Sequence, residues 1–250
     1  MPDALASALG TPGLGWLVFV SLVAGLVRGF AGFGSGLVLL PAAAALLGPV
    51  AGITAMTIAD LAGPVPILRR ALRDAHLRDL GRLLLATAVA LPLGVALLLL
   101  VDPAVFRYAL STVALLTLGL LIGGLRYTGA LTPPLVYGTG GMAGLLGGAV
   151  GVPGPPIITL YLASVQPARV TRATILLYLF AYDLMLLGVY AANGRLLAEA
   201  LVIGALLAVP NITGNLIGAA LFRQSLERLY RIAAYAIIAV SALSALPLWD

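Results

Sequence analysis

Three ionisable side chains, Arg28, Asp60 and Asp183, lie inside long apolar stretches of the sequence. If those stretches cross a membrane, each charge costs on the order of 3 kcal/mol or more, so such residues are candidates for function. The guanidinium of Arg28 has the paired donors that hold an oxyanion. The carboxyl groups of Asp60 and Asp183 could carry coupling protons, pair with an arginine or join helices. The alternative for Arg28 is an ion pair with Asp60 that only orients helices.

Two clusters of glycine and proline interrupt the apolar stretches. The first, one helical turn after Arg28, is Gly32-Phe33-Gly34-Ser35-Gly36, and the second is Gly151-Val152-Pro153-Gly154-Pro155-Pro156. Such backbone is tolerated at membrane depth only where it is buried or lines a cavity. The helices that start near Ser35 and Pro155 would present free N–H groups and partial positive charge to an anion. The clusters therefore predict a substrate-binding site for an anion; alternatively, their glycines only permit close helix packing.

The composition places these residues in a membrane protein. Hydrophobic residues make up 62% of the 250 positions and charged residues 9%, against about 25% charged in a soluble domain. All 14 basic residues are arginines between apolar runs, so we interpret them as determinants of membrane orientation and expect no nucleic-acid partner. The chain has no cysteine and one histidine, His76, so the sequence predicts neither a metal site nor a cofactor.

The apolar stretches predict an all-α polytopic membrane protein, because residues such as Leu, Ala and Val cover every helical face. No hydrophilic stretch between them is long enough to fold alone. The segments are Leu14–Gly48, Val50–Leu68, Leu83–Val101, Val105–Leu125, Pro134–Val165, Ala173–Ala192, Leu197–Phe222 and Leu229–Leu248.

The second half of the chain resembles the first. In each half a similar glycine motif leads into the break, an aspartate follows in the next helix, and a later Gly-x-Ala is followed by arginine. This order predicts two repeats, residues 1–130 and 131–250. The matched residues are Ala24-Gly25-Leu26 with Ala143-Gly144-Leu145, Asp60 with Asp183, Gly94 with Gly218, Ala96 with Ala220 and Arg107 with Arg231.

The positions of the arginines predict that the repeats are inverted. If each broken segment enters and leaves on one side, as a re-entrant hairpin or two short helices, 11 arginines fall on one side, against Arg107 and Arg195. If each is a single span, the division becomes 7 against 6. The positive-inside rule favours the first topology. Each repeat is then a broken segment plus three transmembrane helices, with both termini periplasmic and the connector Arg69–Arg82 cytoplasmic, touching lipid headgroups.

Other polar side chains in the apolar segments offer hydrogen bonds. Isolated hydroxyl and amide groups in membrane helices are more often packing contacts than ligands, so we expect packing to be their main role. They are Ser35, Thr57, Tyr178, Tyr182, Asn211 and Asn215.

The two breaks also resemble a known family. Residues 28–36, Arg-Gly-Phe-Ala-Gly-Phe-Gly-Ser-Gly, followed by Pro41, are similar to the first-repeat signature of the TauE/SafE sulfite exporters. Residues 151–156, followed by Tyr161, resemble the second-repeat signature, although Pro153 replaces a glycine often seen there. Arg172-Ala173-Thr174 is similar to a stretch of one branch. The resemblance implies export of sulfite, or of organosulfur and carboxylate anions such as sulfoacetate, across the bacterial inner membrane.

The residues and the resemblance together predict a secondary carrier for a small anion that works by alternating access. An anion channel is the first alternative. An intramembrane enzyme is the second, and Asp60 with Asp183 would be its only plausible catalytic pair, so we expect no enzymatic activity. The expected partners are the anion and the lipid bilayer, and a homo-oligomer is compatible with the sequence. No nucleotide-binding motif is present, so coupling would come from an ion gradient or the substrate gradient.

Overall fold

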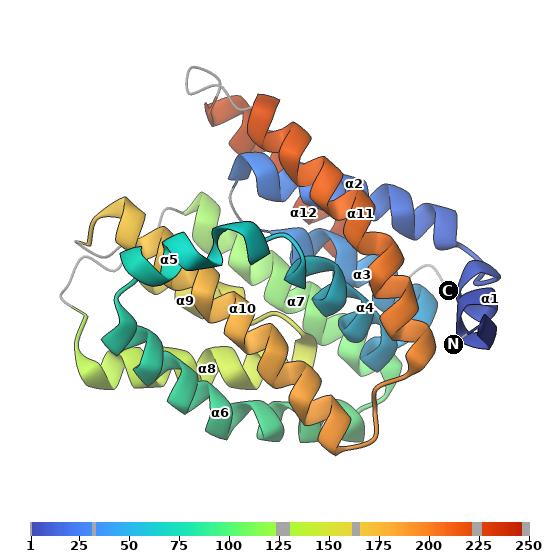
Figure 1. The fold of residues 1–250 in the computed structure, drawn as a ribbon, viewed down its shortest axis with the longest axis horizontal. Helices are drawn as coiled ribbons and strands as arrows, with labels where there is room; N and C mark the ends of the chain where they lie inside the picture. The colour runs from blue at the N-terminus through green and yellow to red at the C-terminus, as the bar shows by residue number, and fades with distance from the viewer. Residues whose placement is uncertain (1, 32–33, 124–130, 162–165, 222–226, 247–250) are drawn as a thin grey trace. The chain divides into compact units, whose positions relative to one another are not determined.

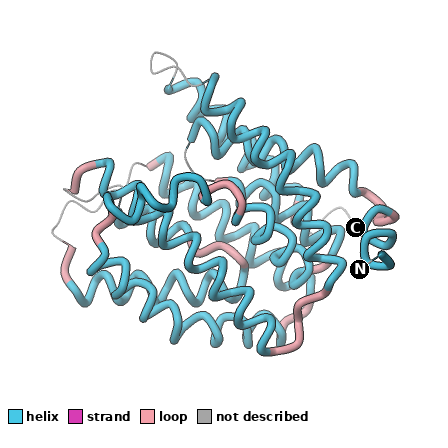
Figure 2. The backbone as a smooth tube through the Cα atoms, in the orientation of Figure 1, coloured by secondary structure: helices cyan, strands magenta, loops and turns pink. Residues whose placement is uncertain are grey.

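The computed structural model describes the whole chain except residues 1, 32–33, 124–130, 162–165, 222–226 and 247–250. Its regular structure in the described ranges is entirely helical, without strands (Figures 1 and 2). The elements are α1 (Pro2–Leu9), α2 (Leu14–Ala31), α3 (Ser35–Leu47), α4 (Pro49–Leu61), the 3₁₀ helix η1 (Val65–Ile67), α5 (Leu68–Asp74), α6 (Leu77–Leu100), α7 (Pro103–Ile122), α8 (Pro133–Val150), α9 (Gly154–Tyr161), α10 (Ala168–Ala192), α11 (Ala198–Leu221) and α12 (Glu227–Ser244).

Every apolar segment of the sequence contains a helix, which confirms the all-α fold class. Among the described residues, the helices α6, α7, α10 and α11 are long and apolar enough to cross a membrane. The pair formed by α4 and residues 65–74 bends by 44° and would be a fifth span if it is counted as one. Leu97, Val89 and other large apolar side chains remain exposed on the protein, as helices that face lipid require.

The apolar segment Val50–Leu68 is not one continuous helix. Helix α4 ends at Leu61, and a turn and the short η1 follow. Pro64 and Pro66 have no N–H group, so they cannot continue the helical hydrogen bonds. The connector Arg69–Arg82 is also more ordered than expected, because it holds α5 and the first turns of α6. Asp79, at the start of α6, is only 3% exposed and contacts Arg82 at 2.9 Å.

The helices form two compact units, and each unit takes segments from both halves of the sequence. The first unit comprises Met1–Gly63, Asp102–Leu118 and Gly194–Asp250. The second comprises Pro64–Val101 and Gly119–Asn193. In the first unit α2 packs along α11, and in the second α6 packs along α8. Each main helix pair therefore joins one helix from the N-terminal half to one from the C-terminal half.

Glycines bring both helix pairs into close backbone contact. A Cβ atom added to Gly29 of α2 would lie 2.8 Å from the Cα of Gly218 in α11. In the second unit, a Cβ atom added to Gly94 of α6 would lie 2.9 Å from the Cα of Gly148 in α8. Neither distance leaves room for a side chain, so small residues set the helix separation, as in many membrane helix pairs.

Candidate functional site

The first break begins where α2 ends at Ala31, and α3 starts at Ser35. Gly34 precedes α3 with a φ angle of 97°, which L-residues with side chains rarely adopt. This explains why the sequence places a glycine at position 34. No side chain caps the start of α3, so the first N–H groups of the helix have no side-chain partner there. Gly32 and Phe33, also predicted to bind substrate, lie outside the described residues.

Three polar side chains meet beside this break, and we call them the Arg28 cluster: Arg28, Ser35 and Asp60. An Arg28 guanidinium nitrogen lies 3.0 Å from a carboxylate oxygen of Asp60, and the hydroxyl of Ser35 donates a hydrogen bond of 2.9 Å to the other oxygen. The Arg28–Asp60 contact is close enough for an ion pair but is not aligned as a hydrogen bond. The two side chains are 19% and 15% exposed. The cluster connects the ends of α2 and α4 to the start of α3.

The geometry contains the Arg28–Asp60 ion pair that the sequence offered as the alternative role of Arg28, and it adds Ser35. The contact with Asp60 engages one terminal nitrogen of Arg28, whereas a guanidinium has five N–H donors. The remaining donors and the uncapped start of α3 belong to the same local region, because Ser35 is the first residue of that helix. The arrangement can neutralise a buried arginine without an anion, and it can offer charge-assisted hydrogen bonds to one.

The second break is built differently. Gly151 ends α8 with a φ angle of 73°, and its N–H donates a hydrogen bond of 2.8 Å to the carbonyl of Gly147. Val152 and Pro153 are buried, and α9 begins at Gly154. Pro155 and Pro156 follow in its first turn.

The prolines change what the start of α9 can donate. Proline has no N–H group, so Pro155 and Pro156 remove two of the donors that a helix start normally offers. At the start of α3, by contrast, Ser35, Gly36 and Leu37 each have an N–H group. The start of α3 therefore offers more backbone N–H donors than the start of α9.

A tyrosine packs against the glycine that precedes the second break. A Cβ atom on Gly147, one turn before Gly151, would lie 2.7 Å from the hydroxyl of Tyr182, so only glycine fits there. Tyr182 is 1% exposed, and its hydroxyl has no hydrogen bond with a described residue. Asp183, the next residue on α10, is partly buried. Its predicted coupling role stays a prediction.

Tyr178 makes the polar contact that Tyr182 lacks. The hydroxyl of Thr87 donates a hydrogen bond of 2.9 Å to the carbonyl of Gly140. The Tyr178 hydroxyl lies 2.9 Å from the same Thr87 oxygen. Thr87 has a single hydroxyl hydrogen, so Tyr178 is the donor between them. This network joins α6, α8 and α10, and it supports the expectation that Tyr178 has a packing role.

Three further polar side-chain groups of the first unit are buried without a hydrogen-bond partner in the described part of the chain. They are the hydroxyls of Thr57 and Ser111 and the amide nitrogen of Asn211. The backbones of Asn211 and Asn215 pack against Gly25, so these residues take part in the α2–α11 contact. The packing role expected for them is consistent with this position.

Sequence reasoning missed the contact between Gly147 and Tyr182, although a signal for it exists. Gly25 and Gly144 are 119 positions apart, and the same spacing relates Arg28 to Gly147. The position that holds a guanidinium in the first half thus holds no side chain in the second, where a tyrosine ring fills the space. An alignment of the two halves, residue by residue at this spacing, would have shown that Arg28 corresponds to Gly147.

Searches of curated proteins and of solved structures found no match to this chain. The family model described as sulfite exporter TauE/SafE matches residues 17–245, nearly the whole chain and both breaks. The match agrees with the apolar helices and identifies a multi-pass membrane protein rather than a soluble one. The chain therefore belongs to the TauE/SafE sulfite exporter family and is a membrane transporter of the anion-exporter type.

Proposed function

We propose that this protein is a secondary transporter that exports a small anion, such as sulfite, sulfoacetate or a related organosulfur or carboxylate anion. The observation that carries the proposal is the Arg28 cluster, in which a partly buried guanidinium lies 3.0 Å from Asp60 beside the uncapped start of α3. An oxyanion suits both groups, because arginine binds it with paired donors and a helix start offers N–H groups.

In the proposed mechanism, the anion competes with Asp60 for Arg28. In the structure Asp60 neutralises the guanidinium, so an anion that binds Arg28 leaves the carboxylate without its ionic partner. Protonation of Asp60 removes that penalty, because a neutral carboxyl group no longer needs the arginine. Binding of the anion and binding of the proton would then favour each other reciprocally, so the two would cross in the same direction, and the outward gradient of the anion would drive export. Asp60 is thus the proposed coupling residue, and Asp183 is the corresponding candidate in the second half.

We also propose that residues of each break bind substrate. They are Gly32, Phe33, Gly34 and Gly36 in the first break and Gly151, Val152, Pro153, Gly154, Pro155 and Pro156 in the second. The start of α9 offers fewer backbone N–H donors than the start of α3, so we propose that the second break contributes less to anion binding.

Transport by alternating access around two inverted repeats is the architecture that we propose for this function. The pairs Gly29–Gly218 and Gly94–Gly148 support a duplicated frame, because each pair joins the two halves at matched positions of the repeat. The inversion rests on the distribution of the arginines and places both termini in the periplasm of a bacterial inner membrane. A tag at either end should be labelled from the periplasmic side of intact cells. Labelling of both tags only from the cytoplasm would exclude this topology.

Counterflow in proteoliposomes tests the transport function directly. Vesicles loaded with one unlabelled anion should accumulate the labelled anion, and the panel is sulfite, sulfoacetate, taurine and simple carboxylates. We expect saturable accumulation of at least one anion and none of zwitterionic taurine, which has no net charge. Flux that rises linearly with concentration would favour the channel alternative. Absence of counterflow for every anion, with correctly inserted protein, would refute the proposal.

A further inference from the structure

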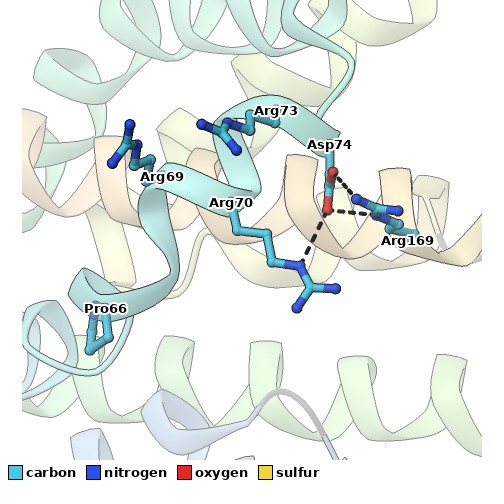
Figure 3. A pocket seen from close by; sticks show the side chains of 6 residues that line it. All are labelled: Pro66, Arg69, Arg70, Arg73, Asp74 and Arg169. Atoms are coloured by element: carbon cyan, nitrogen blue, oxygen red, sulfur yellow. Dashed lines mark hydrogen bonds and ion pairs between the residues drawn. The ribbon is translucent and has the colours of Figure 1, made fainter.

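A basic cavity lies beside α5 in the second unit, and we call it the α5 cavity. It has a volume of about 520 Å³. The side chains of Arg70 and Arg169 are 79% and 68% exposed, so their guanidinium groups are accessible from outside the protein. Figure 3 shows its lining residues, which are Pro66, Arg69, Arg70, Arg73, Asp74 and Arg169.

The single acidic residue of the lining is already engaged. Asp74 accepts two hydrogen bonds from Arg169, at 2.7 and 2.5 Å, and lies 3.9 Å from Arg70. Four arginines against this one carboxylate leave a formal charge of +3 in the lining. The α5 cavity therefore has an excess of positive charge that its own residues do not balance.

Arg69 and Arg73 carry most of that excess. They are four residues apart on α5, so their side chains are neighbours on one helix face, where like charges repel. Neither forms an ion pair with a residue in the described part of the chain, and Figure 3 shows both guanidinium groups away from Asp74 and Arg169. A phosphate group between them would replace the repulsion by charge-assisted hydrogen bonds.

Exposed apolar side chains border the same arginines. Val65 is 56% exposed, Ile67 is 49% exposed and Leu72 is 52% exposed. A soluble anion would use none of this surface, whereas a lipid has an acyl chain beside its phosphate. A short helical segment with arginines next to exposed apolar residues is typical of the membrane interface, where anionic headgroups gather.

We propose that the α5 cavity binds the phosphate of an anionic phospholipid, with the acyl chains against Val65, Ile67 and Leu72. Arg69 and Arg73 bind the phosphate oxygens from one side, and Arg70 adds a further positive charge. Arg169 stays with Asp74 and fixes α5 to the start of α10. This site is separate from the Arg28 cluster and does not depend on which anion the protein transports.

Native mass spectrometry of the purified full chain in detergent tests the lipid site without any transport measurement. Phosphatidylglycerol and phosphatidylcholine with identical acyl chains are titrated in parallel. We expect phosphatidylglycerol to bind on the order of tenfold more tightly, because it alone has a net negative charge. Equal binding of the two lipids would overturn the proposal.

Two matched variants locate the lipid on the protein. Arg73→Gln should weaken phosphatidylglycerol binding about fivefold, since one arginine near the headgroup is lost. Arg195→Gln removes an equally exposed arginine between α10 and α11, and it should leave binding unchanged. The double variant Arg69→Gln with Arg73→Gln should abolish the preference for the anionic lipid. Equal losses in Arg73→Gln and Arg195→Gln would show only a general charge effect and would refute the site.

Competition with glycerol phosphate separates a lipid from a free anion. Glycerol phosphate has the phosphate chemistry of the headgroup without acyl chains, so at a concentration equal to the lipid it should not displace phosphatidylglycerol. Displacement at equal concentration would overturn the lipid assignment and make the α5 cavity a site for a soluble phosphate.

Discussion

The two breaks occupy matched positions of the chain but differ in their chemistry. Beside the first, Arg28, Ser35 and Asp60 form a polar cluster at the start of a helix whose first three residues all have N–H groups. Beside the second, Gly147 takes the position of the arginine, and Tyr182 fills the space. The prolines of α9 reduce its donors further. If the proposed function is right, the first break would contribute more charge to anion binding than the second.

Glycines at the helix contacts show what the two halves share. Gly29 approaches Gly218 in the first unit as Gly148 approaches Gly94 in the second. The two helix backbones lie too close together at these contacts to admit a side chain, so both halves need glycine there. Side chains around the breaks are not restricted in this way and could diverge. The following predictions test whether substitutions beside the first break impair transport more than matched substitutions beside the second.

Replacing Arg28 should have the largest effect. Arg28→Ala should nearly abolish transport, and it leaves Asp60 without its ionic partner, which costs about 3–5 kcal/mol for a buried pair. Arg28→Lys should retain weak transport, because a point charge replaces a forked donor. Initial counterflow rates in proteoliposomes, normalised to inserted protein, measure both.

The double variant Arg28→Ala with Asp60→Ala separates binding from charge pairing. It contains no unpaired charge of this pair, so it should insert and remain folded but stay inactive if Arg28 binds the anion. Transport at close to the parent rate would remove Arg28 from the binding site. The first half would then have no stronger claim to anion binding than the second.

Asp60→Asn should uncouple the transporter. Asparagine resembles a permanently protonated aspartate, so anion counterflow should persist while accumulation driven by a proton gradient is lost. Asp183→Asn is the matched variant in the second half and should retain accumulation. Loss of accumulation in Asp183→Asn alone would move the coupling residue to the second half.

Substitution at the positive-φ glycine of each break should have a similar, moderate effect on stability. Gly34→Ala and Gly151→Ala each force a side chain into the left-handed region, which costs roughly 1–2 kcal/mol. Gly154→Ala is the control, because Gly154 has no positive φ and its nearest neighbour is the flexible end of Ile158 at 3.3 Å. Thermal unfolding in detergent should show lower midpoints for the first two variants than for the third. Equal unfolding midpoints for all three variants would mean that the backbone at the breaks accommodates a side chain at little cost in stability.

Tyr182→Phe should have the smallest effect. Its hydroxyl is buried without a hydrogen-bond partner in the described residues, so its removal should leave stability unchanged or raise it slightly. The apparent KM for the anion should stay within about twofold of the parent if this hydroxyl does not bind substrate, whereas loss of a substrate hydrogen bond worth about 0.5–1.5 kcal/mol would raise KM by roughly 2- to 13-fold. A tenfold increase in KM with unchanged stability would place Tyr182 in the binding site, and the second half would then contribute directly.

Much of the fold follows from local pattern. The apolar segments predicted the helices, because runs of Leu, Ala and Val can satisfy their backbone in lipid only as helices. The segment Val50–Leu68 is apolar throughout its proline-containing part, so composition alone does not mark the end of α4 at Leu61. Asp79 and Arg82 were interpreted as part of a solvated connector, and only the start of α6 at Leu77 brings them into the protein.

The sequence by itself determined the membrane class, the positions of both breaks and the residues that carry charge in apolar surroundings, because these depend on composition and local backbone chemistry. Only the tertiary structure decided which of those residues meet. Arg28 and Asp60 lie on helices separated by the first break, and their 3.0 Å contact depends on how α2 and α4 pack around α3. The Tyr182 ring at Gly147 and the four arginines of the α5 cavity likewise require packing between distant segments, which no local pattern specifies.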